Sequence, residues 1–77
     1  MAYLPAENTK IQTFDYDVNG NLIYQGSAVP GSSKASALWK ISKLIYNGNN
    51  QLTDIQLADG DILENNIWND RASLNYS

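Results

Sequence analysis

Tight-turn dipeptides constrain the fold of this chain more than any other feature. Asn19-Gly20 and Asp59-Gly60 are strong hairpin signals, because tight turns of the primed type need positive φ at their central residues. The stretch "NGNNQ" at residues 47–51 reads as another turn. Between these turns, apolar and polar residues alternate with a period of two, which is the pattern of a half-buried strand. The sequence therefore predicts short antiparallel strands.

The alternation assigns side chains to opposite faces of the predicted strands. In "KIQTFDY", Ile11, Thr13 and Asp15 share one face, and Gln12, Phe14 and Tyr16 share the other. In "ALWKISKLIY", residues 37–46, one face holds Trp39, Ile41, Lys43 and Ile45, and the other face holds Leu38, Lys40, Ser42, Leu44 and Tyr46. A helical spacing of Leu38, Ile41 and Ile45 competes there, but the longer alternation favours a strand. Residues 61–65 are predicted to form a further strand, and residues 67–76 a bend and a last short strand.

These segments indicate an all-β protein. We expect a small single-domain antiparallel barrel or sandwich of about five to six short strands, spanning residues 10–77. The chain has 77 residues, with no cysteine and no histidine. One domain is the only sensible count, and a domain of this size without disulfides often relies on association with copies of itself or with a larger partner.

Residues 1–9 are predicted to form an extended N-terminal arm. Tyr3 and Leu4 are apolar, Pro5 excludes a helix through them, and no alternation ties the stretch to the sheet. We expect this arm to dock on a neighbouring subunit.

The charge balance argues against several classes of partner. The net charge is −3, and the five cations form no run, which disfavours binding of nucleic acid or anionic lipid. The first residues carry no signal-peptide pattern, and no apolar run approaches the length of a membrane span. These observations favour a cytoplasmic product or a particle component assembled in the cytoplasm.

The stretch "DYDVNG", residues 15–20, starts like a calcium loop. Asp15, Asp17 and Asn19 occupy the first three ligand positions and Gly20 the required glycine. The twelfth position needs a bidentate glutamate but holds Gly26, and the flanks alternate as strands instead of helices. We therefore expect a hairpin turn, with Asp17 capping it and positive φ at Asn19 and Gly20, and no metal site.

Catalytic groups are also sparse. Asp54, Asp59, Asp61 and Glu64 lie close together in the sequence, but they are typical of solvated turn carboxylates. Without histidine, no serine has its usual activating base. The expectation is a protein that is not an enzyme and needs no cofactor.

The two tryptophans and the single arginine are the strongest candidates for packing or recognition. Trp39 and Trp68 fill the core or anchor an interface, where tryptophan is enriched. Arg71 pairs with a local charge or stacks on a tryptophan at the C-terminal bend. The candidate partner-contact residues are Tyr3, Leu4, Trp39, Trp68 and Arg71.

Two stretches echo each other. "YDVNGNLIYQ" and "YNGNNQLTDIQ" both place a tyrosine before an Asn/Gly turn and an apolar strand. We interpret them as two hairpins that follow the same turn rules, not as a solenoid, which needs about three repeats to bury a core. The segment "YNGNNQLTDIQLADG" is also similar to the tyrosine-aspartate hairpin repeats of bacterial toxin shells and surface proteins.

A broader resemblance covers roughly residues 14–77. The pieces "YDVNGNLIYQGSAVPGS", "WKISKLIY", "ADGD" and "WNDRASLNY" resemble short virion proteins of tailed bacteriophages. The resemblance implies a non-enzymatic part of the particle, with a capsid decoration, neck or tail accessory role. Its implied partners are other virion proteins, such as major capsid or neck and tail subunits, and copies of the chain itself. The alternative is a small carbohydrate- or protein-binding β module that uses Trp39 or Trp68 as a stacking platform.

Overall fold

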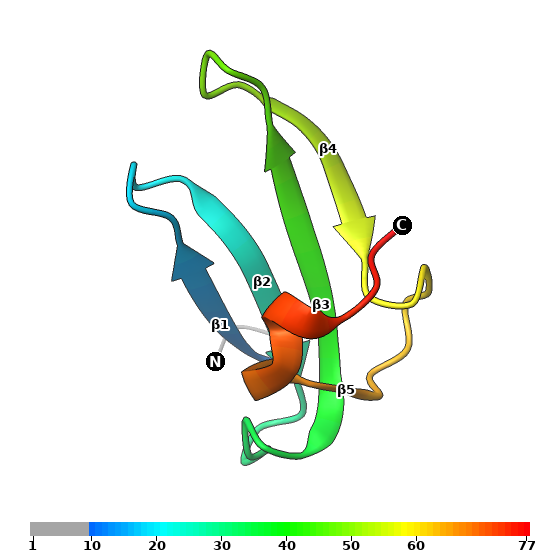
Figure 1. Ribbon diagram of the computed structural model, residues 1–77. Helices are drawn as coiled ribbons and strands as arrows, with labels where there is room; N and C mark the ends of the chain where they lie inside the picture. Colours follow the sequence, from blue (N-terminus) through cyan, green and yellow to red (C-terminus); the bar gives the residue numbers. More distant parts are fainter. Residues whose placement is uncertain (1–9) are drawn as a thin grey trace, which may run out of the picture.

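The computed structural model describes residues 10–77, so the predicted arm with Tyr3 and Leu4 lies outside the described residues. Four strands form an antiparallel sheet in the order β1-β2-β3-β4 (Figure 1): β1 (Ile11–Tyr16), β2 (Leu22–Ala28), β3 (Ala37–Tyr46) and β4 (Leu52–Leu57). A two-residue strand, β5 (Asn66–Ile67), pairs with the N-terminal end of β3. A 3-10 helix, η2 (Trp68–Ser73), follows β5 directly.

The prediction of a small antiparallel all-β domain is confirmed. The sheet stays open and does not close into a barrel. Residues 61–65 are irregular, in contrast to the predicted strand. Residues 67–76 contain the end of β5, the helix η2, and Tyr76, which forms an isolated bridge with Ala58. The alternation of β3 is confirmed, since residues 37–46 form a strand with Trp39 and Ile41 buried on the same face.

One face of the sheet carries the core. The buried apolar residues are Ala28, Trp39, Ile41, Ala58 and Trp68, and η2 lies across this face in front of the sheet in Figure 1. Trp39 is 1% exposed and Trp68 is 4% exposed, and their rings pack with centroids 6.2 Å apart. Both tryptophans therefore act as core residues in this fold.

A glycine in the middle of β2 determines how close η2 can approach. Gly26 pairs with Ile41 on the core face, and the Trp68 ring rests on it. A Cβ atom at position 26 would lie 2.7 Å from Cε3 of Trp68 and 3.1 Å from Cε3 of Trp39. Any side chain there would push the two rings out of contact with the sheet, so only glycine suits this position.

The loops of the β1–β2 and β3–β4 hairpins have the same construction. In residues 17–21, Asp17 N–H donates to the Asn21 carbonyl at 2.9 Å, and Oδ1 of Asp17 accepts from the N–H groups of Asn19 and Asn21. In residues 47–51, the Asn47 N–H donates to the Gln51 carbonyl at 3.0 Å, and its side-chain oxygen accepts from the N–H groups two and four residues later. Asx side chains thus close both loops.

In each of these two five-residue segments, the fourth residue has a left-handed backbone conformation. Gly20 has φ +82° and Asn50 has φ +61°. The hydrogen bonds between residues 17 and 21 and between residues 47 and 51 leave three loop residues in each hairpin, and the last of the three is left-handed, as is common in loops of this length. The expectation of positive φ at Asn19 is wrong, because in a loop of this length only the residue after the turn must be left-handed. The predicted primed turn with two positive φ values occurs at Asp59 and Gly60 instead.

Position 20 offers a direct test of the loop geometry. Gly20→Val should lower the free energy of unfolding by more than about 1 kcal/mol, because a branched side chain resists the left-handed conformation. Gly20→Asn should cost much less, since Asn50 already occupies the equivalent place in the other loop. Urea denaturation of both variants measures the difference, and equal losses would contradict the assigned geometry.

Candidate protein-binding face

Among residues 10–77, no segment covers most of the sheet face that lies opposite η2. Directly paired residues in an antiparallel sheet lie on the same face, so the register defines its rows. One row runs Phe14, Gln25, Ser42 and Leu57, and the next row runs Gln12, Ser27 and Lys40. We call this surface, completed by Tyr16, Leu44 and Ile55, the open face.

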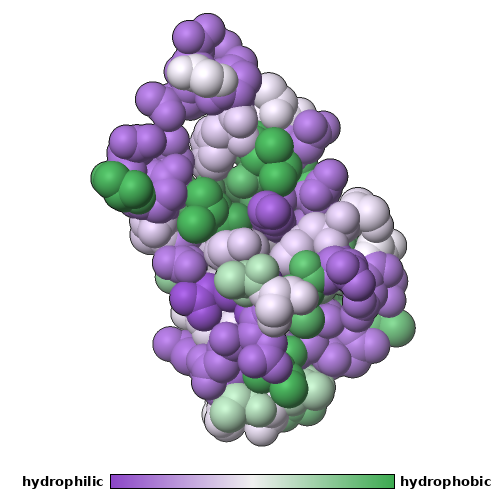
Figure 2. All heavy atoms as spheres, viewed as in Figure 1, coloured by the Kyte–Doolittle hydropathy of each residue, from purple (hydrophilic) through white to green (hydrophobic). Residues whose placement is uncertain are grey.

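The open face is apolar at the end near the hairpin loops. Phe14 is 46% exposed, Tyr16 is 58% exposed and Ile55 is 61% exposed. Leu44 lies between them on β3 and is half-buried. The core face, on which η2 lies, is not fully covered either. Figure 2 views the molecule from the η2 side, and hydrophobic atoms gather on it above the level of the helix.

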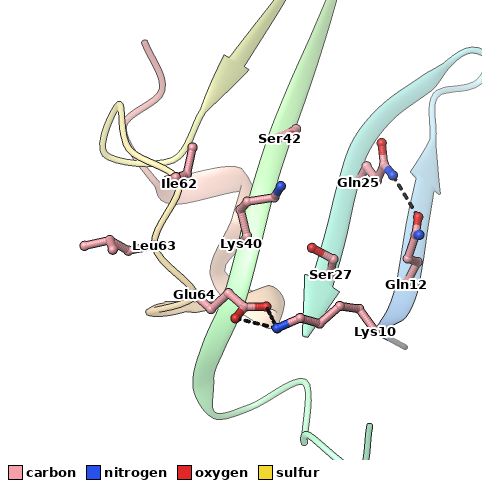
Figure 3. A pocket seen from close by; sticks show the side chains of 9 residues that line it. All are labelled: Lys10, Gln12, Gln25, Ser27, Lys40, Ser42, Ile62, Leu63 and Glu64. Carbon is pink, nitrogen blue, oxygen red and sulfur yellow. Dashed lines mark hydrogen bonds and ion pairs between the residues drawn. The ribbon is translucent and has the colours of Figure 1, made fainter. Parts of the chain in front are cut away.

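The other end of the open face forms a polar groove of about 610 Å³ (Figure 3). Its floor comes from three neighbouring strands and its far wall from the irregular segment after β4. The lining residues are Lys10, Gln12, Gln25, Ser27, Lys40, Ser42, Ile62, Leu63 and Glu64. Amide, hydroxyl and ammonium groups therefore face two exposed aliphatic side chains, Ile62 and Leu63, which are 72% and 56% exposed.

An ion pair closes the lower end of this groove. Nζ of Lys10 lies 2.8 Å and 2.9 Å from the two carboxylate oxygens of Glu64, which ties the start of β1 to the segment 61–65. Both side chains are about one third exposed, so the pair contributes at most about 1 kcal/mol. On the floor, Nε2 of Gln25 donates to Oε1 of Gln12 at 2.9 Å. Lys40 lies on the same floor and forms no ion pair with residues 10–77.

The residues that line the groove supply hydrogen-bonding amide, hydroxyl and ammonium groups. The four carboxylates singled out by sequence are dispersed: Glu64 pairs with Lys10, Asp61 accepts from the Leu63 N–H at 3.1 Å, and Asp54 and Asp59 are exposed. Within residues 10–77, no three acidic side chains come together as a metal site. No helix in the described part of the chain is long and apolar enough to span a membrane.

Arg71 belongs to the other face, where it joins η2 to the sheet. Its Nε donates to Oδ2 of Asp15 at 2.9 Å, and its guanidinium carbon lies 4.6 Å from the centroid of the Trp68 ring. Nη1 also donates to the Trp68 carbonyl at 3.3 Å. The stacking interpretation of Arg71 is therefore what the structure shows, and its acidic partner is Asp15 on β1, not the adjacent Asp70.

Tyr76 extends this arrangement to the C-terminus. Its hydroxyl donates to the Arg71 carbonyl at 2.7 Å, and its ring packs 5.8 Å from the ring of Tyr24. Desolvation by burial, together with the nearby Tyr24, raises the pKa of Tyr76 to about 12. Nζ of Lys43 lies 5.7 Å from the ring centroid. The last residues are thus held against β2 and β3.

Comparison of the chain with family models, with curated proteins and with solved structures finds no match. The candidate surface consequently rests on geometry alone. Sequence reasoning placed Gln12, Phe14, Lys40 and Leu44 on the correct faces of their strands, but it did not identify that face as the uncovered one. It missed the groove entirely, because Ile62, Leu63 and Glu64 reach it through an irregular segment that was expected to be a strand.

The raised pKa of Tyr76 predicts a pH dependence of stability. Above pH 10 the unfolded chain ionises Tyr76, whereas the folded state keeps the proton until about pH 12, so stability is lost across this interval. Tyr76→Phe should therefore show a smaller loss of unfolding free energy between about pH 9 and pH 11.5 than the wild type. Urea denaturation at the two pH values measures it, and equal losses would rule out a shifted Tyr76.

Proposed function

We propose that this protein is a non-enzymatic structural protein of a bacteriophage particle that binds other virion subunits through the open face. The observation that carries the proposal is the exposure of Phe14, Tyr16 and Ile55 at one end of the open face, beside the polar groove at its other end, on a domain with five buried apolar residues among residues 10–77. Exposed apolar patches with a polar rim are typical of protein interaction sites. The resemblance to short phage virion proteins supplies the biological setting, as a capsid decoration, neck or tail accessory protein.

Burial of the exposed apolar side chains of the open face and the groove wall would stabilise a complex with a protein partner. Burying a large aliphatic or aromatic side chain stabilises a complex by about 1.5–3 kcal/mol relative to leaving it exposed. Phe14, Ile55, Ile62 and Leu63 are each between 46% and 72% exposed, so covering them would contribute several kcal/mol. The polar groups of the groove would then fix the orientation of the partner, with Lys40 available to pair with a carboxylate.

A carbohydrate-binding module has less support. The module considered from the sequence would use Trp39 or Trp68 as its stacking platform, and these two residues are only 1% and 4% exposed. Their rings pack against each other and against Gly26, so neither can stack on a sugar without disrupting the core.

The proposal is tested by incorporation into particles. Phage lacking the gene would be supplied with the wild-type protein, with Ile62→Asp in the groove wall, or with Val18→Asp. Val18 is a matched control, because it is a branched aliphatic residue that is 98% exposed at the tip of a hairpin loop. Copies of the protein per purified particle would be measured by quantitative immunoblot.

We expect the wild type and Val18→Asp to be incorporated equally, and Ile62→Asp to bind about tenfold more weakly. All three proteins should melt at the same temperature, since both side chains are exposed. Absence of the wild-type protein from purified particles would refute the proposed function. Equal incorporation of Ile62→Asp would show that the groove wall does not contact the partner.

A further inference from the structure

The sheet consists of two copies of one hairpin unit. Within residues 10–28, six residues recur thirty positions later: Lys10, Ile11, Tyr16, Asn19, Leu22 and Ala28 correspond to Lys40, Ile41, Tyr46, Asn49, Leu52 and Ala58. The first unit forms β1 and β2, and the second forms β3 and β4. The sequence echo that we interpreted as shared turn chemistry therefore extends over the preceding strand as well.

The two units also match in geometry. Both loops have the same hydrogen bonds and a left-handed fourth residue. The register shifts at the same point, between Asp15 and Tyr16 in the first hairpin and between Ile45 and Tyr46 in the second. In each hairpin the tyrosine then pairs with the equivalent leucine, Leu22 or Leu52.

The junction between the units is the β2–β3 pairing. Gln25 pairs with Ser42 and Ser27 pairs with Lys40. The hydroxyl of Tyr46, from the second unit, donates to the Leu22 carbonyl of the first unit at 2.7 Å. β4 is the counterpart of β2, and β1 is the counterpart of β3. The free edge of β4 therefore corresponds to the edge of β2 that pairs with β3, and the free edge of β1 corresponds to the edge of β3 that pairs with β2.

Both outer strands present backbone groups without a strand partner among the described residues. Within residues 10–77, β1 pairs with β2 alone. The C-terminal residues cover the lower end of β4, where Leu57 and Ser77 exchange backbone hydrogen bonds of 3.0 Å and 3.2 Å. Because the backbone groups of Leu57 point away from β3, those of Ile55 do so as well, and residues 52–56 remain an unpaired edge.

We infer that β4 of one copy of this chain pairs with β1 of a second copy in the register of the β2–β3 junction. Ile55 then lies opposite Gln12 of the second copy, and Asp54 lies opposite Thr13. In each pair the two side chains lie on the same side of the sheet: Ile55 and Gln12 belong to the open face, and Asp54 and Thr13 belong to the core face. This contact uses the sheet edges and does not depend on the proposed function of the open face.

Exposure of the equivalent side chains supports this pairing. Tyr46, Leu22 and Gln25 are half-buried at the internal junction. Their counterparts at the outer edges are more exposed: Tyr16 is 58% exposed, Leu52 is 48% exposed and Ile55 is 61% exposed.

In the inferred contact, the Tyr16 hydroxyl of the second copy donates to the Leu52 carbonyl of the first copy, as Tyr46 donates to Leu22 within one chain. The contact is head-to-tail, so it leaves a free β1 and a free β4 at the two ends and permits further addition.

Engineered cysteines test both the partner and the register, since the chain has none of its own. Directly opposed, hydrogen-bonded residues have Cα atoms about 5.5 Å apart, which suits a disulfide. Within one chain, β1 and β4 are separated by two strands and lie about 14 Å apart, so Gln12→Cys/Ile55→Cys can form disulfides only between copies. Val18→Cys/Ile55→Cys is the control, because Val18 is more exposed but lies outside the register.

Under mild oxidation, we expect Gln12→Cys/Ile55→Cys to form a ladder of multiples of 8.5 kDa at least about fivefold faster than the control. Sedimentation equilibrium of the wild type should show a mass that rises with concentration, and Tyr16→Phe should weaken the association about fivefold by removing one hydrogen bond. Equal cross-linking rates in the two cysteine variants, or a wild type that stays at 8.5 kDa at about 1 mM, would overturn the inference.

Discussion

The contact between the Trp68 ring and the backbone of Gly26 is the interaction on which the rest of this structure depends. Burying an indole removes about 150–250 Å² from water, which corresponds to roughly 4–6 kcal/mol. A domain of 77 residues has a total stability on the order of 4–10 kcal/mol. The missing side chain at Gly26 lets the ring reach the sheet, and Arg71 and Tyr76 then fasten the C-terminal residues above it.

This arrangement uses the irregular C-terminal part of the chain to cover one face of the sheet. After β4, the segment 61–65 passes the open face, where Glu64 binds Lys10, and the chain then continues through β5 to η2 on the core face. Within residues 10–77, β1 and residues 52–56 of β4 have no strand partner on their outer side, and most of the open face is not covered. The open face and the two edges are therefore the surfaces through which such a small domain can gain further stability from partners.

Sequence alone predicted the parts of the fold that depend on neighbouring residues. The alternation in β1 and β3 and the turn residues at 17–21, 47–51 and 59–60 follow from local rules. The covering of one face does not, because it depends on Trp68 meeting Gly26, two residues that no local pattern connects. For the same reason, the sequence does not decide whether the tryptophans lie in the core or at an interface. The polar groove could not be predicted either, because it depends on the contact of Ile62 and Glu64 with residues around β1 and β3.

A double-mutant cycle between positions 26 and 68 tests the central claim most directly. Gly26→Ala in the wild type should lower the free energy of unfolding by about 1–3 kcal/mol, because the added Cβ would lie 2.7 Å from the Trp68 ring. In a Trp68→Leu background, the same change should cost at least about 1 kcal/mol less, since most of the clash is gone. Urea denaturation of the four proteins provides the values. Additive effects would contradict the account, because they would show that Gly26 does not serve to seat the Trp68 ring.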